Sequence, residues 1–326
     1  MRKADTPSKA TIFDVAREAG VSTGTVSRVL NNRPGVRVQT RNRVLTAMGR
    51  LEYRPDLAAR ELSFRQSPRI GLNVAVGSRR LFPFFVLFLE HLISELQSDG
   101  FRLEEVPTGS DGLPEYLTDA MVLFGAHDDD PRIPHLQAAR IPFVLVGHCE
   151  GVRWTRADDY DGGIQATRHL ARLGHTEIAH VSGLMNNQAF RDRYRGYLDA
   201  LQQRDQQHAQ LLLDGEFTTL GAYRAIRQAW ERGTRFSAVF AASDEMAVGT
   251  LAALEDLGLK VPTDISVVGF DDLPELGATL TTIRQDIGAV AGAAVRLLKE
   301  GLEGLPVRHE VVPVKLIVRG TTAKRG

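Results

Sequence analysis

Apolar positions recur along this chain with two different spacings, and the spacing changes near residue 68. Up to residue 51 they recur every three or four positions, which is typical of short amphipathic helices. Beyond residue 69, short continuous apolar runs alternate with longer helical patterns. The runs predict strands at residues 70–76, 102–106, 120–124, 143–146, 178–181, 238–241 and 265–270, and the helical patterns predict helices at residues 84–96, 162–173, 193–203, 222–230 and 245–257. Because strands buried on both faces have continuous apolar sequences, this alternation predicts parallel sheets covered by helices on both sides.

The first residues predict two short helices joined by a tight turn. Thr11, with Asp14 three residues on, is a capping signal for the first helix, and Gly20 supplies the left-handed residue that ends it. Ser22 caps the second helix. A third helix is expected at residues 39–51. The apolar residues expected to close a small core from this third helix are Val44, Leu45, Met48 and Leu51.

The second helix carries side chains that point to a function. The residues expected on its outer face are Thr23, Gly24, Thr25, Ser27 and Arg28. They are small, polar or guanidinium groups rather than the Glu and Lys of an ordinary solvated helix. The alternative is a three-helix domain without a nucleic-acid partner. These outer residues favour a helix-turn-helix whose second helix lies in the DNA major groove.

Charge is divided unevenly between the two parts of the chain. Residues 1–66 hold 13 Lys and Arg against 6 Asp and Glu, a net charge of +7. Because the whole chain of 326 residues holds 40 of each kind, the remainder holds 27 basic and 34 acidic residues, a net charge of −7. A basic amino-terminal part attracts DNA phosphates, whereas an acidic remainder is repelled by them.

A specific resemblance is carried by residues 11–31, by Thr40-Arg41 and by the run Tyr53-Arg-Pro-Asp-Leu-Ala-Ala-Arg-Glu-Leu62. Together these segments resemble, without a gap, the DNA-binding head of the lac-repressor (LacI/GalR) family. The later segments resemble the sensor domain of that family more loosely, so the resemblance covers nearly the whole chain. It implies a transcriptional regulator whose body has the fold of periplasmic sugar-binding proteins.

The resemblance implies base contacts at Thr23, Gly24 and Arg28. Arg28 is the expected determinant of sequence specificity, because a guanidinium pairs with guanine through two hydrogen bonds. Gly24 departs from the longer side chains of many relatives and has no side chain with which to read a base. The other expected DNA contacts, most of which hold phosphates and set the register, are Thr11, Ser22, Thr25, Ser27, Asn31, Arg37, Thr40 and Tyr53.

Residues 55–62 match a segment that forms a hinge helix on operator DNA in this family. The resemblance implies DNA contacts from Ala59 and Leu62, with the leucine wedged into the minor groove at the centre of the site. The sequence suits this behaviour, because a helix of about two turns is too short to be stable alone. The alternative is a linker whose leucine packs on the sensor.

Length and composition fit a small head followed by a two-lobed body, since 326 residues are too many for one small core. The expected fold class is α/β, with an N-terminal three-helix helix-turn-helix head plus a bilobal periplasmic-binding-protein-like (type I) body that contains two parallel sheets. The expected domains are a DNA-binding domain at residues 1–54, a hinge helix and linker at 55–68, and an effector-binding and dimerisation domain at 69–326. Its first (near) lobe is expected at about 69–157 and 286–308, and its second (far) lobe at about 158–285 and 309–326.

Ligands of open parallel sheets bind beyond the carboxyl ends of the strands, so residues that follow each expected strand are candidates. The resemblance matches Asp271 to a hydroxyl-binding carboxylate, Arg193 to an effector-binding guanidinium and Phe217 to a stacking aromatic residue. Ser243 stands where many relatives carry Asn. A carboxylate, a guanidinium and an aromatic face suit a sugar. The alternatives are a core position for the phenylalanine, a surface ion pair for the arginine and a loop cap for the aspartate.

Several other residues near the expected cleft allow more than one role. Phe84 or Phe85 is expected to form the wall opposite Phe217, although a core position is an equal alternative. His148, which follows a glycine where several relatives carry an acidic residue, is expected to be solvated, with a hydrogen bond to a ligand as the alternative. The run of residues 128–130, Asp-Asp-Asp, predicts a solvated acidic loop rather than a metal site, because no spaced set of ligands accompanies it.

No motif of an enzyme stands out, since the chain has no phosphate-binding loop, no nucleophile elbow and no zinc-ligand spacing. Catalytic residues, bound metals and cofactors are therefore not expected. The polar first residues are followed by no apolar signal core, and no apolar run is long enough to span a membrane, so a cytoplasmic location without a membrane partner is expected. The single cysteine, Cys149, excludes an internal disulfide and is expected to be a structural thiol, with a cleft role as the alternative.

The function predicted from the sequence is a transcriptional regulator, specifically a repressor whose operator affinity changes when a small sugar binds. A homodimer, formed through apolar helical faces such as residues 290–298, would present two heads to a near-palindromic duplex. Two alternatives are kept. The ligand could act as a corepressor that tightens DNA binding, or the chain could be a solute-binding protein for transport, which the basic head disfavours.

Overall fold

The computed structural model describes residues 10–30, 36–51, 53, 67–75, 83–125, 127–183, 185–202, 210–276 and 278–326. The expected DNA contact Asn31 and the expected hinge, with Ala59 and Leu62, lie outside these residues. The chain divides into two compact units. The first unit, called the head here, comprises residues 1–68 and 98–102, and the second, called the body, comprises residues 69–97 and 103–326.

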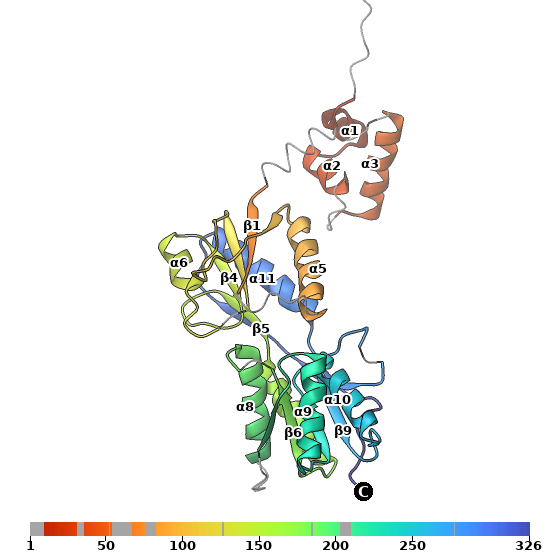
Figure 1. Cartoon of the computed structure of the whole chain (residues 1–326). Coiled ribbons are helices and arrows are strands. Elements are labelled where there is room, and N and C mark those ends of the chain that lie inside the picture. Colours follow the sequence, from red (N-terminus) through yellow and green to blue (C-terminus); the bar gives the residue numbers. More distant parts are fainter. Residues whose placement is uncertain are drawn as a thin grey trace, which may run out of the picture. The chain divides into compact units, whose positions relative to one another are not determined.

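The head contains three helices, α1 (Ile12–Ala19), α2 (Thr23–Leu30) and α3 (Val38–Arg50) (Figure 1). Their ends confirm the predicted caps. Thr11 and Asp14 form a reciprocal capping box, Gly20 has a φ of 63°, and the Ser22 hydroxyl accepts a hydrogen bond from the Thr25 N–H at 3.2 Å. The turn between α1 and α2 is therefore specified by local hydrogen bonds.

The head has a single small core, and one predicted member of it is wrong. Its buried residues are Val15, Ala16, Ala19, Val26, Val29, Val44 and Ala47, with Met48 and Leu51 packed against them. The side chain of Leu45 is 52% exposed instead of buried. Successive residues of a helix point about 100° apart, so a helix that turns Val44 and Ala47 toward a narrow core turns Leu45 away from it.

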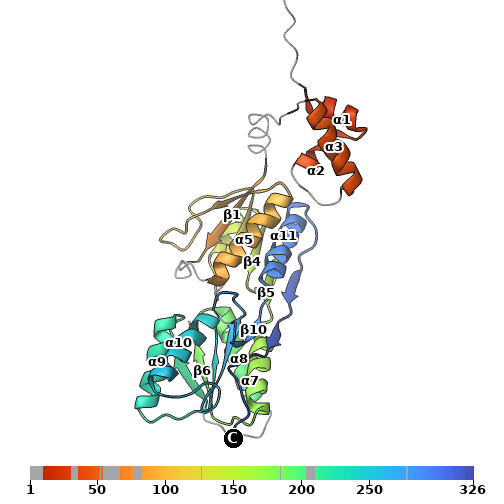
Figure 2. The same ribbon diagram turned by 90° about the vertical axis from the view of Figure 1, so that its right-hand side faces the viewer.

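The first lobe of the body is a sheet covered on both faces. Its strands are β1 (Arg69–Val74), β2 (Arg102–Glu105), β3 (Ala120–Phe124), β4 (Phe143–Val146), β5 (Trp154–Ala157) and β11 (His309–Val312), in the order β11-β5-β4-β3-β1-β2. Its helices are α5 (Pro83–Ser98), α6 (Arg132–Ala138) and α11 (Ile287–Leu302). Helices α5 and α11 lie side by side on one face (Figure 2), whereas Leu136 of α6 packs against Met121 and Leu123 on the other.

The second lobe repeats this plan with different sequence segments. Its strands are β6 (Ile178–Ser182), β7 (Leu211–Asp214), β8 (Ala238–Ala241), β9 (Ser266–Asp271), β10 (Thr281–Arg284) and β12 (Lys315–Ile317), in the order β12-β10-β9-β8-β6-β7. Its helices are α7 (Asp159–Arg172), α8 (Gln188–Gln202), α9 (Thr219–Glu231) and α10 (Asp244–Asp256). Only β12 among the described pairs runs antiparallel to its neighbour. The predicted pair of parallel, helix-covered sheets is confirmed.

The chain passes between the lobes after β5, after β10 and after β11. The third passage corrects one expected boundary. Residues 309–312 were expected in the second lobe, but they form β11, which pairs in parallel with β5 of the first lobe. A four-residue strand of mixed polarity does not specify which sheet it joins. Its partner strand depends on how the preceding segments fold, because those segments determine which sheet edge lies near it.

Helices α7 and α8 touch each other through their backbones. A β-carbon at Gly163 would lie 2.2 Å from the carbonyl oxygen of Arg193, and a β-carbon at Gly196 would lie 2.2 Å from that of Tyr160. No other residue type has room at either position. The close crossing brings Asp159, the first residue of α7, to the side chain of Arg193 on α8.

His180 on β6 makes the stability of the body sensitive to acid. The imidazole is fully buried, Nδ1 lies 3.0 Å from the carbonyl oxygen of Phe240, and burial lowers the pKa from its ordinary value of 6.5 to about 3. Since the unfolded chain then binds the proton first as the pH falls, the free energy of unfolding decreases through the window between these two values.

We expect this histidine to remove about 2 kcal/mol of stability between pH 7 and pH 5. The variant His180→Asn keeps an N–H donor for Phe240 and lacks the titration, so it should lose about that much less stability over the same interval. Urea unfolding at both pH values measures the difference, with His309→Asn, an exposed histidine, as the control. Equal pH dependence in His180→Asn and the unaltered protein would contradict this account.

Candidate functional site

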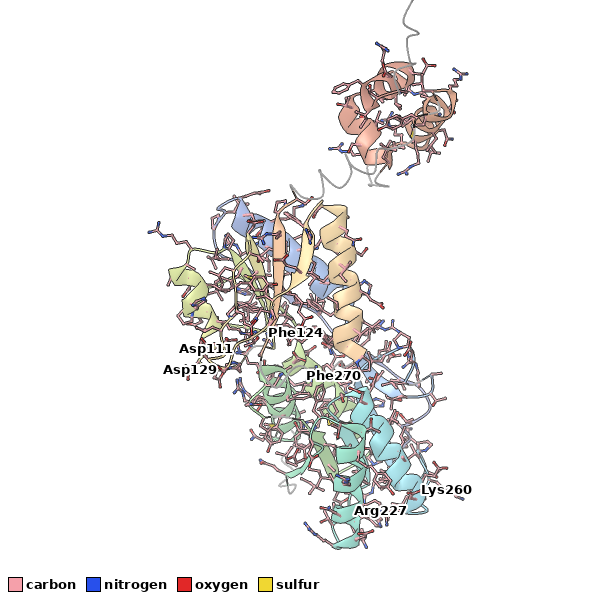
Figure 3. The ribbon with its side chains drawn as sticks, turned by 45° about the horizontal axis from the view of Figure 1, so that its top comes forward. Asp111, Phe124, Asp129, Arg227, Lys260 and Phe270 are labelled. Carbon is pink, nitrogen blue, oxygen red and sulfur yellow. The ribbon has the colours of Figure 1, made fainter. Side chains whose placement is uncertain are left out.

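A cleft lies between the two lobes of the body, with about 870 Å³ of empty space when the open solvent at its mouth is included. Its lining residues from the first lobe are Phe84, Phe124, Gly125, Val146, Gly147, His148, Arg156, Ala157 and Val290. Those from the second lobe and the crossing are Asp159, Asn187, Gln188, Ala189, Phe190, Asp192, Arg193, Phe217, Asp271 and Gln285. Phe124 marks the first-lobe side in Figure 3, and Phe270, which lies beneath Arg193, marks the other side. The carboxyl ends of β3, β4 and β9 reach this cleft, as expected for parallel sheets.

Arg193 forms the charged floor of the cleft. Its Nε and Nη2 atoms each lie 2.8 Å from Oδ1 of Asp159, and Nη1 donates to the carbonyl oxygen of Ala242 at 2.5 Å. The guanidinium carbon lies 3.7 Å from the centre of the Phe270 ring, which is a close cation–π contact. The alternative of a surface ion pair is wrong, because only 5% of this residue is exposed.

Asp271 faces the same guanidinium and lines the cleft. Its Oδ1 lies 3.8 Å from Nη1 of Arg193 and accepts a hydrogen bond from Nε2 of Gln285 at 2.6 Å. Burial raises the pKa of Asp271 well above its ordinary value of 3.8, and raises that of Asp159 as well, while Arg193 opposes both shifts. Two carboxylates therefore share one guanidinium, which leaves the floor rich in hydrogen-bond acceptors.

Backbone strain is concentrated where the second lobe meets the cleft. Asp271 has a φ of 126°, and the neighbouring residues Glu216 and Phe217 both have a φ of 51°, a left-handed region that side chains with a β-carbon seldom adopt. The turn after β7 thereby places the Phe217 ring in the cleft lining, with its centre 4.6 Å from that of Phe190. Strain of this kind persists at sites whose geometry serves binding.

The two phenylalanines expected on the opposite wall separate into different roles. Phe84 lines the cleft, with its ring centre 6.4 Å from that of Phe124. Phe85 is buried behind the wall, with its ring centre 4.9 Å from that of Phe124, and does not line the cleft. Adjacent helical residues point about 100° apart, so only one of them faces the ligand space.

Ser243 is not a cleft residue, which corrects the expectation from the sequence. It is 1% exposed, and its hydroxyl accepts a hydrogen bond from the Met246 N–H at 3.2 Å, so that it caps α10. The next residue, Asp244, accepts hydrogen bonds from the Thr282 hydroxyl at 2.6 Å and the Leu273 N–H at 2.9 Å. Burial raises the pKa of Asp244 to about 6. These two side chains brace the strand ends beneath the site.

The cleft also contains polar residues that the sequence did not predict as ligand contacts, namely His148, Arg156, Asp159, Asn187, Gln188, Asp192 and Gln285. Arg156 donates to Oδ2 of Asp192 at 2.9 Å. The backbone N–H and carbonyl of His148 both bond to the side chain of Gln188, each at 2.9 Å. The His148 side chain lines the cleft and is 39% exposed, so it is partly solvated, and burial lowers its pKa below the ordinary 6.5. The single sequence signal for this group was the position of Asp192 directly before Arg193.

The acidic run at residues 128–130 is also not a simple solvated loop. Asp130 is buried and forms a two-pronged pair with Arg132, whose Nε and Nη2 lie 2.9 and 2.6 Å from its oxygens. Asp128 pairs with Arg191 of α8. Among the described residues there is no group of three or more side chains able to hold a metal ion. Cys149 is half-buried against the core of the first lobe and is not among the cleft residues.

The head presents its candidate DNA contacts on the outer side of α2 and at the ends of α1 and α3. Thr11, Ser22, Gly24, Arg28 and Arg37 are exposed. The remaining candidates in the described part of the head, which are partly exposed, are Thr23, Thr25, Ser27, Thr40 and Tyr53. The Tyr53 side chain packs against the head core. Arg17 and Arg50 pair with Asp14 and Glu18, whereas no carboxylate of the described residues pairs with Arg28.

Comparisons with known proteins agree with both units. Residues 11–56 match the family model described as bacterial regulatory proteins, lacI family, and residues 167–322 match the periplasmic binding protein-like domain. The chain is 35% identical to the HTH-type transcriptional regulator MalR of Streptomyces coelicolor over 96% of each chain. A complex of the transcriptional regulator CelR with cellobiose is 29% identical, with a TM-score of 0.69, and covers 96% of this chain and 99% of that chain. The lac repressor dimer bound to operator and the anti-inducer ONPF is 26% identical, with a TM-score of 0.71 and the same coverage.

One further property concerns membranes. Among the helices of the described residues, none combines the length and the apolar character that a bilayer crossing requires.

Proposed function

Because this chain belongs to the LacI family of bacterial regulatory proteins, whose members are DNA-binding transcriptional regulators rather than enzymes, we propose that a small sugar or glycoside binds in its cleft. The bound ligand changes the affinity of the head for operator DNA, and the protein acts as a repressor. Its operator partner implies that it works in the cytoplasm. The proposed domains are the DNA-binding domain at residues 1–54, the hinge and linker at 55–68 and the effector-binding domain from 69 on, and the division after Pro68 supports the last boundary.

The main support for a sugar as the ligand is the composition of the cleft. Arg193 and Asp271 offer a donor and an acceptor at the floor, and Phe84, Phe124 and Phe217 offer aromatic faces around it. A sugar needs both, since its hydroxyl groups form hydrogen bonds and its apolar ring faces stack on aromatic side chains. The complex of CelR with cellobiose supports the same ligand class for a relative with this fold.

The experiment is a selection of genomic fragments by the purified chain, followed by a thermal-shift screen with cellobiose, maltose and ribose. A ligand that binds only the folded protein raises the melting temperature. Operator titration with and without that sugar then decides between an inducer, which weakens DNA binding, and a corepressor, which tightens it. Failure to retain any fragment at low salt would overturn the proposal, and a sugar that leaves operator affinity unchanged at saturation would not be the effector.

Arg28 is proposed to read one guanine of each half-site. We expect Arg28→Ala to weaken operator binding about 5- to 150-fold and to relax the preference at one base pair, because a two-bond contact with guanine provides about 1–3 kcal/mol of discrimination. Arg28→Lys is the matched control, since it keeps the charge for phosphates but loses the planar fork. Binding to a library of operator variants measures both effects. An unchanged base preference in Arg28→Ala would rule out this role.

A further inference from the structure

The amino-terminal turns of α8 in the second lobe are contacted by residues of the first lobe at several points. Asp128 and Arg191 form a two-pronged pair, with Nη1–Oδ2 and Nη2–Oδ1 distances of 2.5 and 2.8 Å. One turn earlier on α8, Gln188 exchanges two hydrogen bonds with the backbone of His148. Asp192 accepts from Arg156. The lobes are thus joined at one edge of the cleft by polar contacts rather than by an apolar core.

Only one of these contacts is separate from the ligand space. Gln188, His148, Arg156 and Asp192 all line the cleft, so a change at any of them would alter ligand contacts as well as the joint between the lobes. Asp128 and Arg191 are not among the lining residues. Substitutions at this pair therefore change the joint and leave the cleft surface intact.

On each side, the Asp128–Arg191 pair is attached to a part of the body that is anchored to its own lobe by further contacts. On the first lobe, the loop that carries Asp128 is anchored by the buried Asp130–Arg132 pair, and Nη1 of Arg132 also donates to the carbonyl oxygens of Asn73 and Phe124 at 3.2 and 3.1 Å. On the second lobe, Arg191 lies on α8, which packs closely on α7. Because both sides are anchored to their own lobes by these contacts, separation of the lobes at this edge is expected to break the Asp128–Arg191 pair.

We propose that Asp128 and Arg191 are positioning residues that set the balance between closed and open lobes, and through it the apparent affinity of the cleft for its ligand. A ligand that contacts both walls binds the closed form, and its apparent affinity falls in proportion to the fraction of closed molecules. The effect on ligand affinity rests on the proposed function, whereas the effect on closure does not.

The strength of the pair follows from its exposure. The side chain of Arg191 is 31% exposed and that of Asp128 is 64% exposed, so solvent screens part of their attraction. Exposed ion pairs of good geometry shift an equilibrium by about two- to fivefold. Loss of the pair is therefore expected to raise the ratio of open to closed molecules by about that factor without unfolding the protein.

Energy transfer between dyes on the two lobes measures this ratio without any ligand. The full chain would carry Cys149→Ser, together with Gln137→Cys on α6 and Gln228→Cys on α9, both of which are exposed. Labelled chains are mixed with an excess of unlabelled chains, so that transfer between subunits of a dimer does not contribute. We expect Asp128→Asn and Arg191→Gln each to lower the transfer efficiency and the double variant to lower it no further.

Two control variants distinguish the loss of the Asp128–Arg191 ion pair from a general effect of removing a charge. Asp129→Asn removes the same charge one residue away, from an exposed side chain labelled in Figure 3, and should leave the transfer unchanged. The exchange Asp128→Arg with Arg191→Asp restores an opposite-charge pair and should recover most of the lost transfer. Unchanged transfer in both single variants, or the same loss in Asp129→Asn, would overturn the proposal.

The ligand arm of the experiment keeps this proposal distinct from the proposed function. If cellobiose, maltose and ribose all fail to bind while the variants still open the lobes, the role of the Asp128–Arg191 pair in closure is supported and the assignment of a sugar ligand is overturned. If a sugar binds, Asp128→Asn should weaken its apparent affinity about two- to fivefold. Unchanged affinity beside an opened cleft would overturn the link to ligand binding.

Discussion

Replacing Arg193 by leucine is expected to abolish the response to ligand and to lower the free energy of unfolding by about 3–5 kcal/mol at neutral pH. The guanidinium is the shared counter-charge of Asp159 and Asp271, both of which are buried. Without it, two carboxylates remain in the interior with no opposite charge between them. Urea unfolding measures the stability, and operator titration with and without ligand measures the response, while the head should still bind DNA.

The pH dependence of this variant provides its internal control. Burial already raises the pKa of both carboxyl groups, and loss of Arg193 removes the group that opposes the rise. A carboxyl group whose pKa is higher in the folded protein favours folding below that pKa, so Arg193→Leu should regain stability as the pH falls from 7 toward 5. Adding Asp159→Asn should recover part of the loss at pH 7. A deficit that is the same at both pH values would contradict the shared-charge account.

Replacing Gly163 by alanine is expected to destabilise the body by about 3 kcal/mol, because the new β-carbon would lie 2.2 Å from the carbonyl oxygen of Arg193. A backbone carbonyl cannot rotate away as a side chain does, so α7 and α8 must move apart. That movement separates Asp159 from Arg193 and should weaken ligand binding as well. Thermal unfolding and the ligand-induced shift of the melting temperature report the two effects.

Two other glycines serve as references for this prediction. The new β-carbon of Gly196→Ala would clash with the Tyr160 carbonyl oxygen at the same helix crossing. The double variant Gly163→Ala/Gly196→Ala should therefore be only slightly less stable than either single variant. Gly49→Ala on α3 meets no atom within 4 Å and should not reduce stability, since alanine is the better helix former. Unimpaired stability of Gly163→Ala would show that the helices do not depend on this contact.

Much of the architecture was predictable from local sequence. The capping box at Thr11 and the left-handed Gly20 specify the turn between α1 and α2 through hydrogen bonds within a few residues. The continuous apolar run at residues 143–146 predicted β4 with its observed bounds, because most positions of a strand covered on both faces are apolar. The family resemblance, together with the strand-end rule, led to Arg193, Phe217 and Asp271, which all line the cleft.

The remaining features could not be predicted, because they depend on partners distant in sequence. Ser243 looked equivalent to Asp271 as a polar residue after a strand, yet it caps α10 and is buried. The acidic run at residues 128–130 looked solvated until Arg132 and Arg191 supplied its counter-charges. Residues 309–312 carried no signal for the sheet that they join.

The sequence alone determined the three helices of the head with their caps, seven of the twelve described strands, and the class of groups that follow several of those strands, since these depend on interactions over a few residues. The tertiary structure alone decided which of those groups face the cleft and which form hydrogen bonds with the protein behind it. It also decided where polar contacts join the two lobes. The pairing of Asp159 with Arg193 illustrates the reason. The two residues are 34 positions apart, and only the glycine crossing of α7 and α8 brings their charges within 2.8 Å.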